Sequence, residues 1–136
     1  MKNLFKYAVV LLFASFISCI SEGEERLDYY KNQNRSPELK GWWRQINDEN
    51  NPNHPPHLNF TNYKLFFHYY NIHTNMYRET FSYWYNDTDR IFMLDAPSPT
   101  SEVNEDNFNY HLNDSKDTLT FYLSDPPYIY VKSQGL

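Results

Sequence analysis

Short runs of aromatic and β-branched residues, separated by Asn, Asp, Ser and Pro, make up the chain from residue 39 onward. Runs of this length between turn-forming residues are typical of all-β domains. Helical spacing of apolar residues is not sustained anywhere after the apolar N-terminal segment. The pattern therefore predicts eight strands, near residues 41–47, 57–60, 63–70, 76–85, 90–94, 108–112, 118–123 and 128–132.

Two hairpins stand out in this pattern. In FSYWYNDTDRIFML the strands flank residues 86–89, and in FNYHLNDSKDTLTFYL they flank residues 113–117. Asn and Asp favour such turns because they tolerate left-handed backbone and bond their own chain, so both strand pairs are expected to be antiparallel. A meander of seven or eight strands with two apolar faces must stack as two sheets or close on itself, since open edges invite aggregation.

Alternation within each strand predicts which side chains face the interior. In the strand at 76–85 the odd-numbered row is taken as the inner one, which places Trp84 on the opposite face. The strand at 63–70 is apolar on both faces, so it lies between two layers or presents Phe66 and Tyr70 as a contact surface. The residues predicted to face inward are Leu65, Phe67, Tyr69, Phe81, Tyr83, Tyr85, Phe108, Tyr110, Leu112, Leu119, Phe121 and Leu123.

The N-terminal residues 1–18 have the pattern of an export signal. Two lysines precede about a dozen mostly apolar residues, well short of the ~20 that a membrane-spanning helix needs. The residues before Cys19, Phe-Ile-Ser, resemble the lipobox of bacterial lipoproteins. That resemblance implies cleavage after residue 18 and acylation of Cys19, which would anchor the protein to a membrane. The alternatives are a secreted protein cut nearby with an incidental cysteine, or a free buried cysteine.

Residues 19–38 are expected to form the acylated cysteine and a polar tether, followed by a single domain at 39–136. The stretch SEGEE after Cys19 resembles the signal that sends some Gram-negative lipoproteins to the outer face of the outer membrane, although an ordinary solvated linker would look much the same. The expected location is therefore the outer membrane, through a lipid anchor, with exposure at the cell surface as one possibility.

Composition narrows the range of functions. The 136 residues carry a formal net charge of -5 and no basic stripe, which argues against a nucleic-acid partner. Removal of residues 1–18 takes away two of the 12 basic residues and leaves 17 acidic ones, a net charge of about -7. A single cysteine forms no internal disulfide, and only three glycines leave little room for a phosphate-binding loop.

Catalytic and metal-binding patterns are weak. The segment His54-Pro55-Pro56-His57 places two imidazoles in one loop, but no spacing fixes a third ligand. No nucleophile elbow and no spaced acid/base pair appears, and the Asp residues of the two hairpins are turn formers. The chain is therefore expected to be no enzyme and to need no metal or cofactor.

Four segments together resemble the lipocalin-like domains of small bacterial cell-envelope lipoproteins. LKGWWRQIND contains the G-x-W of lipocalins, YIYVKS resembles their closing strand, and SYWYNDTDRIFML and YHLNDSKDTLTFYL resemble their hairpins. The similarity spans residues 39–133 and implies a single antiparallel up-and-down β-barrel of about eight strands. It also implies that Trp43 closes one end of the barrel and that Lys132, where the family more often has Arg, stacks against it.

The resemblance leaves two functions open. In the first, an anchored barrel binds a small apolar or aromatic ligand at its open mouth. In the second, aromatic side chains fill the barrel, which presents its outer aromatics and the 95–107 loop to another envelope protein, as an inhibitor or a complex subunit. For the first function, the candidate ligand-lining residues are Phe67, Tyr69, Tyr83, Tyr85 and Tyr110.

Overall fold

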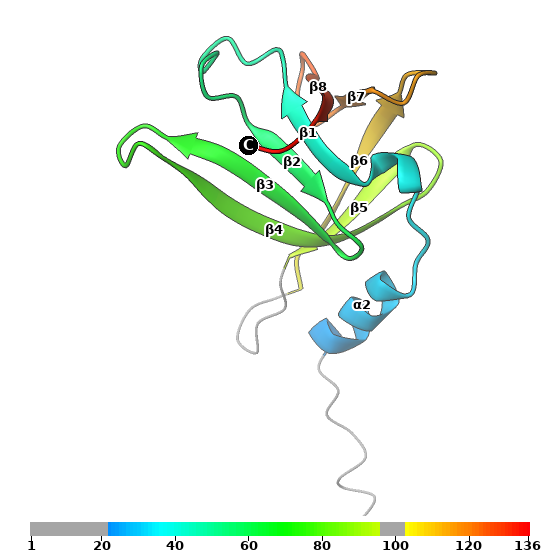
Figure 1. Ribbon diagram of the computed structural model, residues 1–136. Coiled ribbons are helices and arrows are strands. Elements are labelled where there is room, and N and C mark those ends of the chain that lie inside the picture. Colours follow the sequence, from blue (N-terminus) through cyan, green and yellow to red (C-terminus); the bar gives the residue numbers. More distant parts are fainter. Residues whose placement is uncertain (1–21, 96–102) are drawn as a thin grey trace, which may run out of the picture.

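The computed structural model describes residues 22–95 and 103–136, and it is an antiparallel barrel with one short α-helix outside (Figure 1). Every strand pairs with its neighbour in sequence, and β8 pairs with β1 to close the barrel. The predicted up-and-down barrel of eight strands is thus confirmed. The elements are α2 (Glu22–Lys31), the 3-10 helix η1 (Pro37–Leu39), β1 (Gly41–Gln45), β2 (His57–Phe60), β3 (Lys64–Asn71), β4 (Met76–Asn86), β5 (Arg90–Asp95), β6 (Glu105–Leu112), β7 (Thr118–Phe121) and β8 (Tyr128–Ser133).

Side-chain hydrogen bonds explain why the two predicted hairpins turn where they do. Between β4 and β5, Asp87 Oδ1 accepts from the backbone N–H groups of Asp89 and Arg90 at 3.2 and 2.9 Å. Between β6 and β7, Asn113 Oδ1 accepts from the N–H groups of Asp117 and Thr118, each at 3.0 Å. Short polar side chains thus satisfy backbone donors that the tight turns leave without strand partners.

Large side chains fill the interior of the barrel. Trp43 and Trp84 are both fully buried, and the edge of the Phe60 ring meets Trp84 with 4.8 Å between ring centroids. The Trp84 indole N–H donates to Thr61 O at 3.1 Å, so its polar atom is satisfied. The interior cluster consists of Leu39, Trp43, Leu58, Phe60, Leu65, Trp84, Ile91, Met93, Leu119, Phe121 and Tyr130.

The predicted facing of β4 is wrong. Ser82, Trp84 and Asn86 are the buried row of this strand, whereas Tyr83 and Tyr85 point outward. The two polar members of the inner row are satisfied, because Ser82 Oγ donates to Asp95 Oδ1 at 3.0 Å and Asn86 Nδ2 donates to Tyr110 Oη at 3.0 Å. Hydrogen bonds of this kind remove the cost of burying polar groups. The Trp84 indole, which is larger than the rings of Tyr83 and Tyr85, then occupies the interior position.

The helix α2 covers the outward tyrosines, so residues 22–38 are not a free tether. Tyr30 is 2% exposed, its hydroxyl donates to Met93 O at 3.2 Å, and its ring lies 4.8 Å from that of Tyr85. Tyr85 in turn stacks on Phe92 of β5 with 4.6 Å between centroids. These contacts form a second, smaller apolar cluster on the outside of β4 and β5. Within the described residues, no helix is long and apolar enough to cross a membrane.

The segment that links α2 to β1 is fastened by two polar side chains. The Arg35 guanidinium donates to Trp84 O at 2.7 Å, to Gln33 O at 2.8 Å and to Tyr30 O. Asn86 accepts from the Ser36 N–H at 2.8 Å and donates to Ser36 Oγ at 2.9 Å. Because Asn86 and the Trp84 carbonyl belong to β4, these bonds hold the linking segment against the barrel. We call residues 32–40 the strap.

Stability at alkaline pH offers a test of the α2 contacts. Burial, aided by its contact with Tyr29, raises the pKa of Tyr85 from an ordinary value of 10.0 to about 12. A group with a raised folded-state pKa favours the folded protein below its unfolded pKa, and this contribution is lost as pH rises from about 10 through 12. We expect the urea midpoint to fall over that range, and to fall less in Tyr85→Phe. Equal losses in both proteins would contradict the proposed contribution of Tyr85.

Candidate functional site at the barrel mouth

The up-and-down topology gives the barrel two distinct ends. The turns at 61–63, 87–89 and 113–117 lie at one end, together with the strap. The connections at 46–56, 72–75 and 122–127 lie at the other. We call the first the closed end and the second the mouth.

Trp43 and Lys132 meet at the closed end. Lys132 Nζ lies 4.3 Å from the centroid of the Trp43 ring and donates to the carbonyls of Glu38 and Lys40, each at 2.8 Å. The Trp43 indole N–H donates to Leu39 O at 2.8 Å. Burial lowers the pKa of Lys132 from its ordinary value. The structure thus brings together the two residues expected to close the barrel, and the ammonium satisfies two strap carbonyls as well as stacking on the ring.

The mouth holds a pocket of about 320 Å³. Phe67 of β3, Leu123 after β7 and Tyr130 of β8 contribute apolar groups, and Asp48 and Asn50 contribute polar ones from the connection between β1 and β2. Burial raises the pKa of Tyr130. This combination of aromatic walls with a few polar groups is typical of sites for small ligands, which often occur in barrel mouths. The full lining is Gln45, Asp48, Asn50, Pro56, Phe67, Leu123, Tyr128 and Tyr130.

Asn47 holds the two sides of this pocket together. Its side-chain N–H donates to Pro127 O at 2.8 Å, and its side-chain oxygen accepts from the Ile129 N–H at 2.9 Å. The Ile46 N–H donates to Ile129 O at 2.9 Å. These bonds join the residues just after β1 to those around the start of β8, so the pocket is formed by connections with fixed relative positions.

The five predicted ligand-lining residues do not meet at one site. Phe67 alone lines the mouth pocket. Tyr69 is 43% exposed on the part of β3 that extends past β2, while Tyr83 and Tyr85 lie on the outer face described above. Tyr110 lines a separate notch at the closed end. The prediction took the wrong row of β4 as inner, which explains two of the four misplaced residues.

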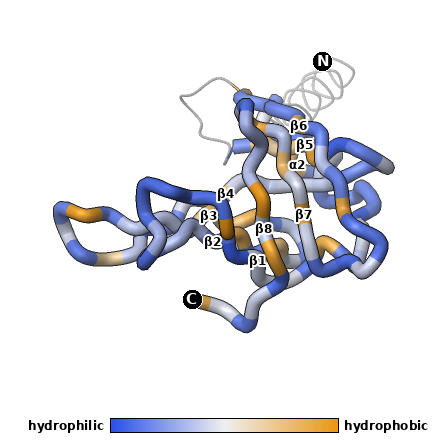
Figure 2. The backbone as a smooth tube through the Cα atoms, turned by 90° about the horizontal axis from the view of Figure 1, so that it is seen from above, coloured by the Kyte–Doolittle hydropathy of each residue, from blue (hydrophilic) through white to orange (hydrophobic). Residues whose placement is uncertain are grey.

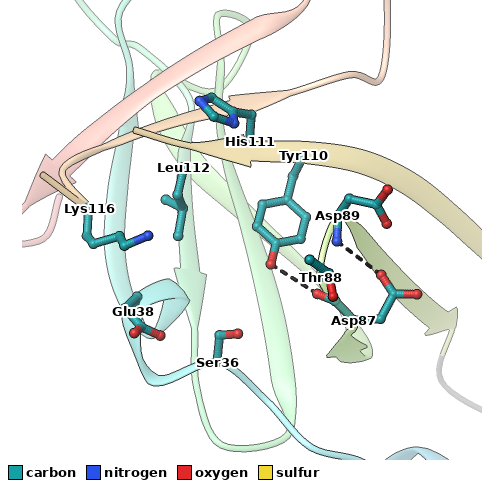
Figure 3. Close-up of a pocket in the computed structure, with 9 residues that line it drawn as sticks. All are labelled: Ser36, Glu38, Asp87, Thr88, Asp89, Tyr110, His111, Leu112 and Lys116. Carbon is teal, nitrogen blue, oxygen red and sulfur yellow. Dashed lines mark hydrogen bonds between the residues drawn. The ribbon is translucent and has the colours of Figure 1, made fainter. Parts of the chain in front are cut away.

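The closed-end notch around Tyr110 is polar and carries charges of both signs (Figure 3). The Tyr110 hydroxyl donates to Asp87 O at 3.1 Å and so joins β6 to the turn between β4 and β5. Glu38, Lys116 and His111 line the same notch of about 380 Å³. The Tyr110 hydroxyl is thus engaged in fixing the turn, and Tyr110 is no part of the mouth.

Three histidines on the outside of β2 and β3 pack against neighbouring aromatic rings or bond to the backbone. His54 stacks on Tyr70 with 3.8 Å between centroids, and His57 Nδ1 lies 2.8 Å from Pro55 O. His68 is buried beside Trp42, 4.8 Å between centroids. Burial lowers the pKa of both His57 and His68. Among the residues described, no three His, Cys, Asp or Glu side chains lie together as a metal-binding group.

Comparisons with known proteins leave the family open. No protein-family model, no curated protein and no solved structure matches this chain. The lipocalin-like assignment therefore remains a resemblance carried by residues 39–133, and the function must be argued from the geometry of the molecule itself.

Sequence reasoning missed most of the mouth lining. Leu123 was assigned to the inner row by alternation, and the same period-2 rule applied to β8 would have paired Tyr128 with Tyr130. Asp48, Asn50 and Pro56 belong to a connection without regular periodicity, so no pattern in the sequence places them at the mouth.

The hairpin of β3 and β4 reaches beyond the other strands in both views of the chain (Figures 1 and 2). The last residues of β3 and the first of β4 pair only with each other, from Tyr69 opposite Arg78 to Asn71 opposite Met76. Ile72 is 68% exposed and Met76 is 65% exposed at this tip. Trp84, which the alternation of β4 placed on the outer face, lies in the core and so forms no common outer patch with Phe66 and Tyr70.

Proposed function

We propose that this protein is a non-enzymatic, lipid-anchored envelope protein whose barrel mouth binds a small apolar or aromatic group. The single observation that supports the proposal most directly is the mouth pocket, where aromatic and aliphatic side chains converge with a few polar groups. Its volume of about 320 Å³ is near the lower end of the range of about 300–1,000 Å³ found for small-molecule sites.

The filled interior limits what such a ligand can be. Trp43, Trp84 and Phe121 occupy the space below the mouth, so a long acyl chain has no deep channel among the described residues. A compact ligand with one or two rings would contact Phe67 and Tyr130 and bring its polar substituent to the rim, where Asp48 and Asn50 offer hydrogen-bonding groups.

Lipid attachment at Cys19 would hold the barrel close to the membrane. Only three peptide steps separate Cys19 from Glu22, where α2 begins, and three steps span at most about 11 Å. Because α2 is fastened to β4 and β5, the chain length available as a leash is much shorter than residues 19–38 suggest. Mass spectrometry of the native protein tests the anchor, and an N-terminal Cys19 without acyl chains would contradict it.

Ligand binding can be tested with a matched pair of neighbouring residues. Leu123 lines the mouth pocket, whereas the next residue back, Tyr122, is exposed on the outside. We expect N-phenyl-1-naphthylamine, an uncharged aromatic probe, to fluoresce on binding the wild-type protein. Leu123→Lys should weaken this binding at least about tenfold, because it brings an ammonium into an apolar site.

Tyr122→Lys serves as the control and should bind the probe as the wild type does. Urea unfolding of each variant ensures that the comparison is made between folded proteins. Absence of probe binding to the wild type, or equal binding by Leu123→Lys, would contradict a ligand site at the mouth.

A second candidate function is recognition of another envelope protein through the projecting hairpin. The observation that favours it is the exposed apolar tip with Ile72 and Met76, since exposed apolar side chains on a protruding element are typical of interaction surfaces. If this function operates, a protein co-purified from solubilised envelope by the wild type should be lost with Ile72→Asp and Met76→Asp. It should be retained with Tyr122→Asp, which changes an exposed side chain of a different part of the barrel.

A further inference from the structure

A small notch beside the C-terminal end of α2 is lined by three cationic side chains. Lys31 ends α2, Arg35 lies in the strap, and Lys40 immediately precedes β1. The notch has a volume of about 270 Å³, and its complete lining is Lys31, Gln33, Asn34, Arg35, Lys40, Asn62 and Tyr63. No carboxylate is among these residues, although acidic residues outnumber basic ones by 17 to 12 in the chain.

The charges of the three cations are not neutralised by neighbouring acids. Within the described part of the chain, none of Lys31, Arg35 and Lys40 forms an ion pair; the ion pairs found there involve Arg26, His68 and Arg90. Three like charges around one concavity repel each other, and a bound anion would relieve that repulsion. The notch is therefore a place of positive potential on a protein of net negative charge.

Arg35 holds its position through the backbone. Its guanidinium donates to Trp84 O, Gln33 O and Tyr30 O, and its Cζ atom lies 5.3 Å from the centroid of the Tyr63 ring. Tyr30 O is among the last carbonyls of α2, where the helix dipole is negative and would oppose an anion. Arg35 offsets that dipole, and its fixed guanidinium supplies a preorganised charge at one side of the notch.

The two lysines supply the donors that remain available for a ligand. Lys40 Nζ donates to Asn62 Oδ1 at 3.0 Å, an arrangement that leaves the Asn62 amide N–H groups free to donate to a ligand. Lys31 Nζ lies 6.0 Å from the Tyr83 ring centroid, with no carboxylate paired to it among the described residues. Ammonium and amide donors without an acidic acceptor suit a group with several charged oxygens, and lysine commonly binds phosphate as a point charge.

We propose that the notch lined by Lys31, Arg35 and Lys40 binds a phosphate group. A phosphate carries up to two negative charges and three or more acceptor oxygens, which matches three cations better than a single carboxylate does. The ring of Tyr63 beside the notch would favour a phosphomonoester whose organic part is flat.

The position of the notch favours a phosphate ligand from solution. It lies at the C-terminal end of α2, and the ten residues of this helix separate it by about 15 Å from Glu22, where the described chain begins. A headgroup of an anchoring bilayer would approach from the opposite end of this helix. The two sources share the same phosphate chemistry, and separate ligands distinguish them by experiment.

The test is an NMR titration of the folded chain at low ionic strength with inorganic phosphate and with phenyl phosphate. We expect saturable shifts confined to the amide signals of residues 31–40 and 62–63, with tighter binding of phenyl phosphate and weaker binding as salt is added. Lys31→Gln and Lys40→Gln should each weaken binding at least about threefold, since each removes one charge from the site. Vesicles containing phosphatidylglycerol form a third arm, and binding to them that requires Lys31 and Lys40 would assign the phosphate to a lipid headgroup.

Lys116→Gln is the matched control, because it removes one positive charge from a different notch at the closed end. It should leave phosphate binding unchanged. The proposal is overturned if the wild type shows no saturable shifts with either soluble phosphate or with vesicles, or if Lys116→Gln weakens binding as much as Lys40→Gln does. Neither result depends on whether the mouth pocket binds an apolar ligand.

Discussion

Replacing Trp84 by alanine is expected to lower the free energy of unfolding by about 3–5 kcal/mol. The indole is fully buried, meets Phe60 edge-on and donates a hydrogen bond to Thr61 O. Its removal leaves a cavity in the core of the barrel near the closed end and deprives the Thr61 carbonyl of its indole donor, two costs that add. Urea unfolding followed by circular dichroism measures the difference.

Tyr83→Ala provides the matched control for this prediction. Tyr83 precedes Trp84 in the same strand and faces outward, where Lys31 and Lys64 lie about 6 Å from its ring centroid. We expect it to cost less than about 1.5 kcal/mol. Together the two variants test the facing of β4, and a larger loss for Tyr83→Ala than for Trp84→Ala would show that the opposite row faces inward.

Replacing Tyr30 by alanine is expected to cost about 2–4 kcal/mol, the second-largest effect among the substitutions considered. The ring is buried between α2 and the barrel, where it meets Tyr85, and its hydroxyl bonds to Met93 O. Loss of these contacts should also release α2 from β4 and β5. Limited proteolysis is expected to cut the variant within residues 22–38 while the barrel stays intact.

Tyr29→Ala tests whether the effect is specific to the buried tyrosine. Tyr29 is the preceding residue and is 44% exposed. Its substitution should change the free energy of unfolding by less than about 1 kcal/mol, because an exposed ring loses little burial. Similar losses for the two variants, or unchanged proteolysis of Tyr30→Ala, would contradict a docked α2.

A docked α2 contributes to only one of the two proposed binding sites. The notch lined by Lys31, Arg35 and Lys40 depends on the position of α2, whereas the mouth pocket is formed only by strands and their connections. Tyr30→Ala is therefore expected to weaken phosphate binding and to leave probe binding at the mouth unchanged. The two sites can thus be perturbed separately.

The sequence by itself determined the number of strands, their order and the location of the turns. These features depend on local chemistry: period-2 alternation, and Asn and Asp side chains such as Asn113 that bond their own backbone. Neighbouring antiparallel strands without long crossovers leave two outcomes open, two stacked sheets or a closed barrel, and only the resemblance to lipocalin-like domains favoured the barrel. The contact between Trp43 and Lys132 was likewise expected, from a resemblance that the structure fits at this position.

The tertiary structure alone decided which face of β4 is buried, where α2 lies and what lines the mouth. The odd row of β4 carries four aromatic residues and the even row only Trp84, so the sequence pattern favours the odd row as the inner one, yet the even row is buried. The choice depends on partners distant in sequence: Asp95 for Ser82, Ser36 and Tyr110 for Asn86, and α2 for Tyr85. The hydrophobic effect is non-directional. Hydrogen bonds between separate segments therefore determine which of the two rows faces the core.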